Sequence, residues 1–262
     1  MAGIVLVFEG QGATAVPGEP PLVLTALAPA DAQRAIVIHQ LGRARALQAS
    51  GAPVVGVVGQ SLGELTALVV AGALAEEAAL DLVRLRAELP ARLLPPRPWT
   101  MASMTRLRLA AAERAADGLE LWVVGRNGPA DCIVVGTTPD FGTFVARVGA
   151  TPTTYRELPV VAPYHTPAMA PVAAALAEAV AGLDVRDPRL DVVTPTGPGE
   201  VVTADDVRRV VVEALTSPVA WSEALGLAAR RWPDARWREC GPSCSLHRFV
   251  WKNGLDLDWD EA

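Results

Sequence analysis

Residues 54–74, VVGVVGQSLGELTALVVAGAL, constrain the fold more than any other stretch of the chain. An apolar, β-branched run ends at Gly59, a Gly-x-Ser-x-Gly turn follows, and an apolar helix is expected from Ser61 to Leu74. A serine at such a strand-turn-helix junction lies at the carboxyl end of a buried strand. The stretch therefore predicts a parallel α/β sheet with Ser61 at the carboxyl end of one of its strands.

The same alternation of strand and helix continues on both sides of this stretch. The expected elements are a buried strand at 4–8, a Pro-rich loop at 17–30, a helix at 31–48 capped by Asp31, a helix at 76–89 ending near Pro90, a long helix from His165 to about Leu183, a strand at 191–195, a helix at 203–217 and a strand and turn at 235–243.

Between residues 97 and 160 the units become shorter and follow the order β-α-β-β-α-β, which is typical of a ferredoxin-like domain. A turn at Asn127-Gly128 is expected between its two central β-rich runs. We therefore predict an α/β fold with an α/β-hydrolase-like parallel-sheet body, residues 1–96 and 161–262, and an inserted ferredoxin-like small domain at 97–160.

Composition argues against several functions. The chain has 29 acidic and 23 basic side chains, a formal net charge of -6 and no cluster of Lys and Arg, so a nucleic-acid partner is not expected. Three cysteines fit reduced thiols better than a disulfide framework. The sequence offers neither a signal-peptide pattern at its start nor an apolar run long enough for a membrane helix. We expect a soluble, cytoplasmic protein that does not bind membranes.

Ser61 is a candidate nucleophile. A serine hydroxyl needs a base to take its proton and donors that stabilise the oxyanion. The flanking glycines permit a tight turn, and the N–H of Leu62 would lie at a helix N-terminus, where negative charge is favoured. The alternative is a glycine-rich turn with an incidental serine.

The sequence resembles the malonyl-CoA:acyl-carrier-protein transacylase family, the acyltransferases of fatty-acid and polyketide synthesis. The matches run in the family's order over nearly the whole chain: VFEGQGA for F-P-G-Q-G-S, GQSLGE for Gly-His-Ser-x-Gly-Glu, LVRLRAEL, LPVVAPYHTPAM, TSPVAW and GPS.

The resemblance implies a role for three further residues. His165 would be the general base, Gln11 would supply the second oxyanion N–H, and Arg86 would pair with the free carboxylate of a dicarboxylic acyl group. Taken alone, each has another interpretation: a structural histidine, a simple turn and a solvated helix charge.

Three positions depart from the family's usual residues. Gln60 replaces the histidine before the nucleophile, and Tyr164, before His165, would crowd an α-methyl group, which favours malonyl. The alternative is that Tyr164 only packs in the wall between the two domains and does not affect acyl choice. The resemblance also implies that the histidine is held by backbone carbonyls and by a polar side chain near TSPVAW; here that side chain would be Ser217, where family members often carry Asn.

The resemblance implies a ping-pong acyltransferase that moves a malonyl group from malonyl-CoA to the phosphopantetheine thiol of an acyl carrier protein through a Ser61 acyl-enzyme. Arg126 and Arg248 could form a basic patch for an acidic carrier. The alternatives are an editing acyl hydrolase, a transferase of an unusual acyl group, and a non-catalytic carrier-binding relative. No cofactor and no metal are expected, although Cys240, Cys244 and His247 are closely spaced. We expect a monomer.

Overall fold

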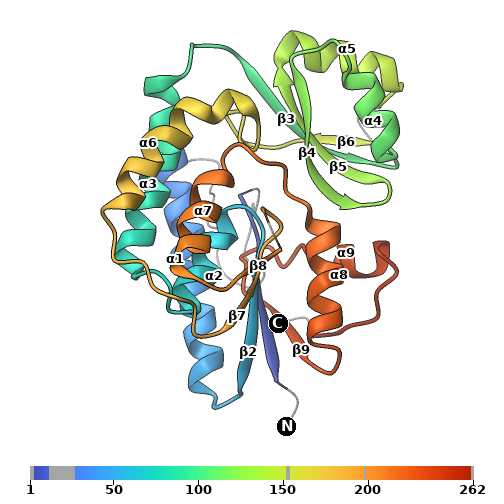
Figure 1. Cartoon of the computed structure of the whole chain (residues 1–262). Coiled ribbons are helices and arrows are strands. Elements are labelled where there is room, and N and C mark those ends of the chain that lie inside the picture. The colour runs from blue at the N-terminus through green and yellow to red at the C-terminus, as the bar shows by residue number, and fades with distance from the viewer. Residues whose placement is uncertain (1–2, 12–26, 152–153, 198, 261–262) are drawn as a thin grey trace.

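The computed structural model describes residues 3–11, 27–151, 154–197 and 199–260. The described residues form two sheets, one with strand order β10-β9-β1-β2-β7-β8 and one with order β4-β5-β3-β6 (Figure 1). The expected loop at 17–30 lies outside the described residues as far as 26.

The larger sheet and its helices form the body. Its elements are β1 (Ile4–Phe8), α1 (Pro29–Ala49), β2 (Val54–Gly59), α2 (Leu62–Val70), α3 (Glu76–Leu93), the 3₁₀ helix η2 (Pro167–Met169), α6 (Ala170–Ala181), β7 (Asp191–Val193), β8 (Glu200–Val201), α7 (Ala204–Glu213), α8 (Trp221–Arg231), β9 (Arg236–Glu239), α9 (Arg248–Lys252) and β10 (Asp258–Asp260). Its strands pair in parallel, except that β8 pairs antiparallel with β7.

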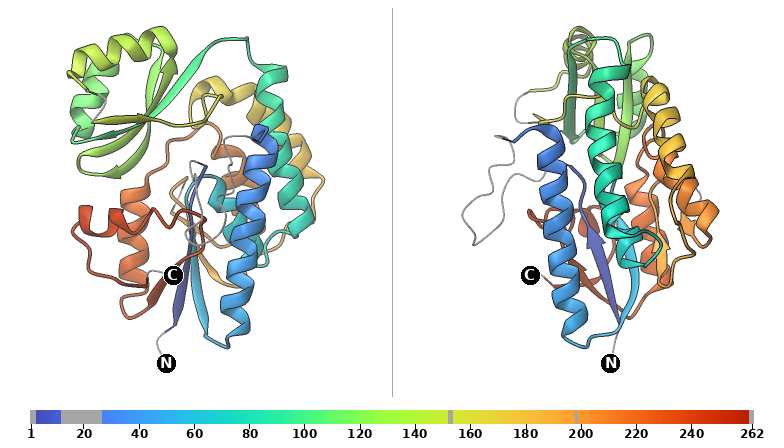
Figure 2. Two further views of the ribbon diagram at one scale, coloured as in Figure 1. Left: turned by 180° about the vertical axis from the view of Figure 1, so that it is seen from behind. Right: turned by 90° about the vertical axis from the view of Figure 1, so that its left-hand side faces the viewer.

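Strand β1 shows how the sheet separates two apolar cores. Because successive side chains of a strand point to opposite faces, Leu6 and Phe8 pack under helices α1, α2, α3, α6 and α7, whereas Val5 and Val7 pack with Trp221 of α8. Helices α1, α3 and α6 lie side by side over the first face (Figure 2). Burial on both faces explains why β1 is apolar throughout.

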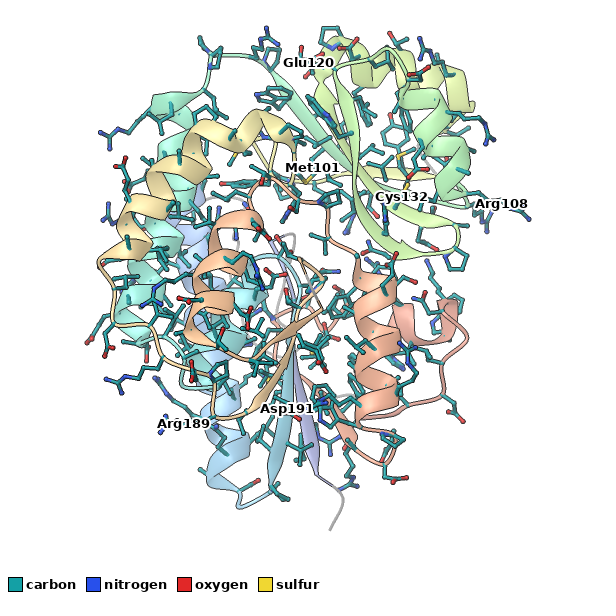
Figure 3. All side chains as sticks on the ribbon, in the orientation of Figure 1. Met101, Arg108, Glu120, Cys132, Arg189 and Asp191 are labelled. Atoms are coloured by element: carbon teal, nitrogen blue, oxygen red, sulfur yellow. The ribbon has the colours of Figure 1, made fainter. Side chains whose placement is uncertain are left out.

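The smaller sheet lies over the carboxyl ends of the parallel strands. Its elements are β3 (Trp99–Thr105), α4 (Leu109–Ala116), β4 (Leu121–Gly128), β5 (Asp131–Thr137), α5 (Thr138–Val148) and β6 (Tyr155–Glu157). The strands pair antiparallel in the order that a ferredoxin-like unit requires. Figure 3 labels Met101 of β3 where this sheet meets the body, with Arg189 and Asp191 at the opposite end. The predicted mixed α/β fold is confirmed, while the exact domain boundaries stay a prediction.

Several predicted helix boundaries in the body were wrong, including the start of the long helix, which is expected at His165 but lies at Ala170. Helix α1 begins at Pro29 with Ala28 as N-cap, so Asp31 lies in the first turn instead of capping it. Helix α2 ends at Val70 and does not reach Leu74, because Gly72 adopts a left-handed φ of 74° that ends the helical path.

The hairpin turn of the small sheet was also placed wrongly. The chain turns at Pro129-Ala130, and Gly128 still pairs with Asp131. Asn127 is buried in β4, and its carbonyl oxygen accepts a hydrogen bond from the side chain of Asn253. Proline is favoured at the first central position of a common β-turn, which suits position 129.

None of the helices in the described part of the chain is both long enough and apolar enough to span a membrane.

Candidate active site

Ser61 lies in the turn that joins β2 to α2, in a conformation that few side-chain-bearing residues adopt. Its φ is 54°, a strained region that persists only where the surroundings impose it. A Cβ at Gly59 would lie 2.4 Å from the Gly63 carbonyl oxygen, and one at Gly63 would lie 2.3 Å from the Phe8 carbonyl oxygen. The two glycines are required because backbone passes where a side chain would be.

The Ser61 hydroxyl meets His165. Ser61 Oγ lies 2.7 Å from His165 Nε2. In the sequence Ser61 precedes the small unit and His165 follows it. His165 Nδ1 is 3.2 Å from the carbonyl oxygen of Ser217, and the His165 N–H donates to the carbonyl of Leu215 at 2.8 Å. A carbonyl only accepts hydrogen bonds, so Nδ1 carries the proton and Nε2 is free to accept from the serine.

Residue 217 contacts the histidine through its main chain. The resemblance implies an orienting role for the Ser217 side chain, whereas the contact that the structure shows is the carbonyl oxygen. This contact does not depend on the type of side chain at 217.

The His165 imidazole is neutral in this setting. Burial, and then the positive charge of Arg86, lower the pKa of His165 to about 3. The imidazole is therefore uncharged at neutral pH and can accept the proton of Ser61.

The turn after β1 packs directly against Ser61. A Cβ at Gly10 would lie 3.3 Å from the Ser61 Cβ, which leaves Gln11 beside Ser61. Leu62 is the first residue of α2, so the helix itself does not use its N–H. Gln11 and Leu62 thus flank Ser61 from two turns, an arrangement in which two N–H groups can converge on one oxyanion.

Glu9 fixes this turn from behind. Its buried carboxylate accepts hydrogen bonds from the Ser243 N–H at 2.7 Å, from the Ser243 hydroxyl and from Ser245 Oγ at 3.2 Å. Its carbonyl oxygen accepts from Gln40 Nε2 at 2.7 Å. Burial raises the pKa of Glu9 despite these hydrogen bonds. Sequence reasoning did not single out Glu9, which stands where the family motif has proline.

A cleft of about 480 Å³ brings most of the predicted site residues together. Those that line it are Gln11, Gln60, Ser61, Arg86, Tyr164 and His165. Much of the remaining wall is apolar and includes Met101 and Val160. Mostly apolar walls with a few convergent polar groups are typical of a small-molecule site.

Arg86 is the cation of this cleft. Its side chain is buried, its Cζ lies 4.9 Å from the centre of the Tyr164 ring, and its Nε has no hydrogen-bond partner among the described residues. Burial lowers the pKa of Arg86, while Tyr164 and then Glu64 offset that effect. A buried guanidinium with an unused donor is suited to an anionic ligand group, and a carboxylate fits its fork geometry.

Glu64 lies on α2 behind Arg86. Its Oε1 accepts hydrogen bonds from Thr194 at 3.0 Å and from Thr196 at 2.8 Å. Burial is the largest influence and raises the pKa of Glu64 to about 7, with Arg86 among the groups that oppose it. At neutral pH the carboxyl group is therefore only partly ionised, and it leaves Arg86 available to another anion.

Gln60 reaches across to the small sheet. Its Nε2 donates to Asn127 Oδ1 at 3.3 Å, and both residues line the cleft. The sequence pattern assigns Asn127 no chemical role and places it in a turn. Sequence reasoning expects that turn beside the cleft, but it misses that Asn127 lies within strand β4.

A second cleft, of about 450 Å³, opens beside the first and shares Gly10, Gln11, Gln60 and Asn127 with it. Its outer lining includes Arg156 and Arg248. Burial lowers the pKa of Arg248, and the positive charge of Arg156 lowers it further. The two guanidinium groups are therefore close enough to repel each other. This cleft connects the surroundings of Ser61 to a basic surface.

Comparison with known proteins identifies the family of the chain. The family described as "Acyl transferase domain" matches residues 27–236. This chain belongs to the acyl transferase domain family. Polyketide synthase GfsB of Streptomyces halstedii is 30% identical over 216 residues, which are 82% of this chain and 4% of that protein. The malonyl CoA-acyl carrier protein transacylase of Bacillus subtilis (strain 168) is 26% identical over 229 residues, 84% of this chain and 68% of that protein.

Solved acyltransferase structures share the fold. The acyltransferase domain of an iterative polyketide synthase in enediyne biosynthesis has a TM-score of 0.80 at 32% identity and covers 98% of this chain and 65% of its own. PlMCAT is a malonyl-transacylase in complex with the type II polyketide-synthase carrier protein AntF. It has a TM-score of 0.86 at 23% identity, and the match covers 99% of this chain and 96% of PlMCAT. The chain is thus an acyltransferase-family protein that spans a small part of the large synthases it matches.

Proposed function

We propose that this protein transfers a malonyl or related dicarboxylic acyl group from CoA to the phosphopantetheine thiol of an acyl carrier protein through a Ser61 acyl-enzyme. The observation that carries the proposal is the buried Arg86, with an unused Nε–H, in the same cleft as the Ser61–His165 pair. A monocarboxylic acyl group would leave this guanidinium without a partner.

In the first half-reaction His165 Nε2 takes the Ser61 hydroxyl proton while Oγ forms a bond to the thioester carbonyl carbon. The N–H groups of Gln11 and Leu62 stabilise the oxyanion that develops. The carbon–sulfur bond then breaks, and the proton on His165 passes to the leaving CoA thiolate. Arg86 holds the distal carboxylate, which fixes the carbonyl carbon beside Oγ.

The second half-reaction repeats these steps with the carrier thiol as nucleophile. His165 takes the thiol proton, sulfur attacks the acyl-enzyme carbonyl, and Ser61 leaves with the proton returned. The second cleft supports a path for the phosphopantetheine arm, because it joins the Ser61 site and carries Arg156 and Arg248 toward the surface. Guanidinium groups suit the phosphodiester of that arm.

The relatives support the donor and acceptor. The Bacillus subtilis relative is named as a malonyl CoA-acyl carrier protein transacylase, and PlMCAT is described in complex with a carrier protein. We take the present chain to act as a cytoplasmic monomer.

The test is acyl loading followed by intact mass. Purified protein is incubated with malonyl-CoA or acetyl-CoA, and Arg86→Ala is compared with Arg84→Ala, whose exposed side chain pairs with Glu88 on the same helix. We expect malonyl to load on Ser61, Arg86→Ala to lose malonyl loading, and Arg84→Ala to keep it. If Arg86→Ala loaded malonyl and acetyl to the same extent as the parent does, the carboxylate role of Arg86 would be contradicted.

The same measurement separates transfer from editing. A transferase keeps its acyl group until a thiol is added, so the malonyl-enzyme should persist in buffer and disappear when holo carrier protein is supplied. Rapid loss of the acyl group to water without a thiol would instead indicate an editing hydrolase, and loading by only longer monocarboxylic groups would indicate a transferase of an unusual acyl group.

A further inference from the structure

Helix α3 contains a proline at the position where it affects Arg86. Pro90 lies inside the helix, four residues after Arg86. The sequence predicts a helix end near this proline, but the helix continues to Leu93. Proline has no N–H, so the helical hydrogen bond that would normally reach the Arg86 carbonyl oxygen cannot form.

Tyr164 supplies the missing donor. Its hydroxyl donates to the Arg86 carbonyl oxygen at 2.9 Å, and Tyr164 itself is buried. The same hydroxyl accepts a hydrogen bond from Gln33 Nε2 of α1 at 3.3 Å. The phenol is therefore fixed between two helices, and it satisfies a buried carbonyl that Pro90 leaves open.

Tyr164 also contacts the other end of Arg86. The guanidinium carbon lies over the Tyr164 ring, 4.9 Å from its centre, within the range of a cation–π interaction. One residue thus fixes both the main chain and the charged group of Arg86.

We propose that Tyr164 and Pro90 are a matched pair that positions the Arg86 guanidinium for the acyl carboxylate. Tyr164 is a positioning residue here, acting through Arg86. The inference rests on the proposed function, because it assigns Arg86 a carboxylate to bind. The prediction specific to it is that the need for the Tyr164 hydroxyl depends on the proline at 90.

The experiment compares Tyr164→Phe, Pro90→Ala and the double variant. Tyr164→Phe keeps the ring but leaves the Arg86 carbonyl unsatisfied, whereas the alanine at position 90 of the double variant offers that carbonyl a helical N–H. Tyr155→Phe, at the only other tyrosine of the chain, is the matched control, since its ring packs on Phe141 in the small unit. Transfer from malonyl-CoA and from acetyl-CoA to free pantetheine is measured for each variant.

We expect Tyr164→Phe to lower kcat/KM for malonyl-CoA about tenfold, mainly through KM, and to change the acetyl-CoA reaction less than about twofold. The double variant should recover most of the malonyl loss, and Tyr155→Phe should behave as the parent. The unfolding equilibrium constants of the two single variants should also be non-additive, by about threefold or more.

Equal losses for malonyl and acetyl in Tyr164→Phe would overturn the proposal, as would a double variant no better than Tyr164→Phe. Including Arg86→Ala separates the two failures. If Arg86→Ala selectively loses malonyl transfer while Tyr164→Phe does not, only the matched pair is wrong. If Arg86→Ala changes malonyl and acetyl transfer equally, the proposed function is wrong and the positioning role is overturned with it.

Discussion

Ser61 and His165 both have a left-handed φ, 54° and 67°, and their side chains meet with Oγ 2.7 Å from Nε2. Such strain persists only where neighbouring structure imposes it. At Ser61 the close backbone contacts of Gly59 and Gly63 do so, and at His165 the main-chain bond to Leu215 contributes. The pair is held in place before any substrate arrives, which is the condition for proton transfer at low reorganisation cost.

Removing either partner should abolish acyl loading. We expect Ser61→Ala to show no acyl adduct, because the atom that carries the acyl group is gone. His165→Gln should slow loading by about 10²- to 10⁴-fold, the usual contribution of a general base. Stopped reactions analysed by intact mass give both rates. A malonyl adduct that still forms on Ser61→Ala would place the nucleophile elsewhere.

Acetyl loading should be independent of pH across the neutral range. The pKa of His165 is lowered to about 3 by burial and then by Arg86, so the base is already neutral well below pH 5. Loading from acetyl-CoA should therefore be flat from about pH 5 to about pH 8. In Arg86→Ala, loss of the cation raises the pKa of His165, and the acid-side inflection should move upward. A parent inflection near 6.5 would show that the histidine is solvated.

The elbow glycine cannot carry a side chain. Gly63→Ala places a Cβ 2.3 Å from the Phe8 carbonyl oxygen, so we expect the free energy of unfolding to fall by about 2 kcal/mol or more and acyl loading to be lost. Gly42→Ala is the matched control, since nothing lies within 4 Å of the new Cβ and alanine favours a helix by about 0.5–1 kcal/mol. Urea unfolding measures both. Similar destabilisation in the two variants would mean that the elbow tolerates a side chain.

Local patterns were sufficient for the elbow and for the layered fold. The glycines around Ser61 and the apolar run of β2 specify their own conformation, so the strand-turn-helix unit could be predicted from adjacent residues. The role of His165 could not be derived from its own neighbours and depended on the family resemblance. Its partners, the carbonyls of Leu215 and Ser217, carry no side-chain signal at all.

Other wrong predictions have non-local causes. A proline at position 90 favours a helix end because the Arg86 carbonyl oxygen loses its helical N–H donor. In the structure Tyr164, far along the chain, donates to that oxygen instead, and the helix continues. Asn127 and Gly128 indicate a turn, yet Gly128 pairs with Asp131 in the ladder, and the Asn127 carbonyl accepts from Asn253. Helix α8, which the sequence pattern did not indicate, depends on Trp221 packing against the second face of the sheet.

Ionisation of Glu64 should make the protein less stable as the pH rises. Burial raises its pKa from 4.5 to about 7, so the folded state binds the proton more tightly than the unfolded state does. The resulting stabilisation is present below about pH 4.5 and is lost as the pH rises through about 7, a change of about 3 kcal/mol. Glu64→Gln keeps an acceptor for Thr194 and Thr196 but cannot ionise.

The measurement is the free energy of unfolding in urea at about pH 5 and about pH 8. The parent should lose more stability over this interval than Glu64→Gln, and taking the difference cancels contributions from His165 and other titrating groups. Glu178→Gln, at a position on α6 away from the cleft, is the control and should follow the parent. Parallel curves for parent and Glu64→Gln would show that Glu64 is hydrated in the folded protein.

Arg248, but not Arg126, should serve the carrier protein, although the sequence proposed both. Arg126 lies 3.9 Å from each of Glu113 and Glu223, which offset its charge, whereas Arg248 lines the second cleft beside Arg156. We expect Arg248→Gln to raise KM for an acidic holo carrier protein about five- to tenfold at low salt, with less effect at high salt, because charge complementarity acts through screened attraction. Arg126→Gln should change it less than about twofold. With malonyl-CoA saturating, neither substitution should alter transfer to pantetheine, which lacks the phosphate. Equal effects of the two substitutions would mean that the carrier protein does not approach along the second cleft.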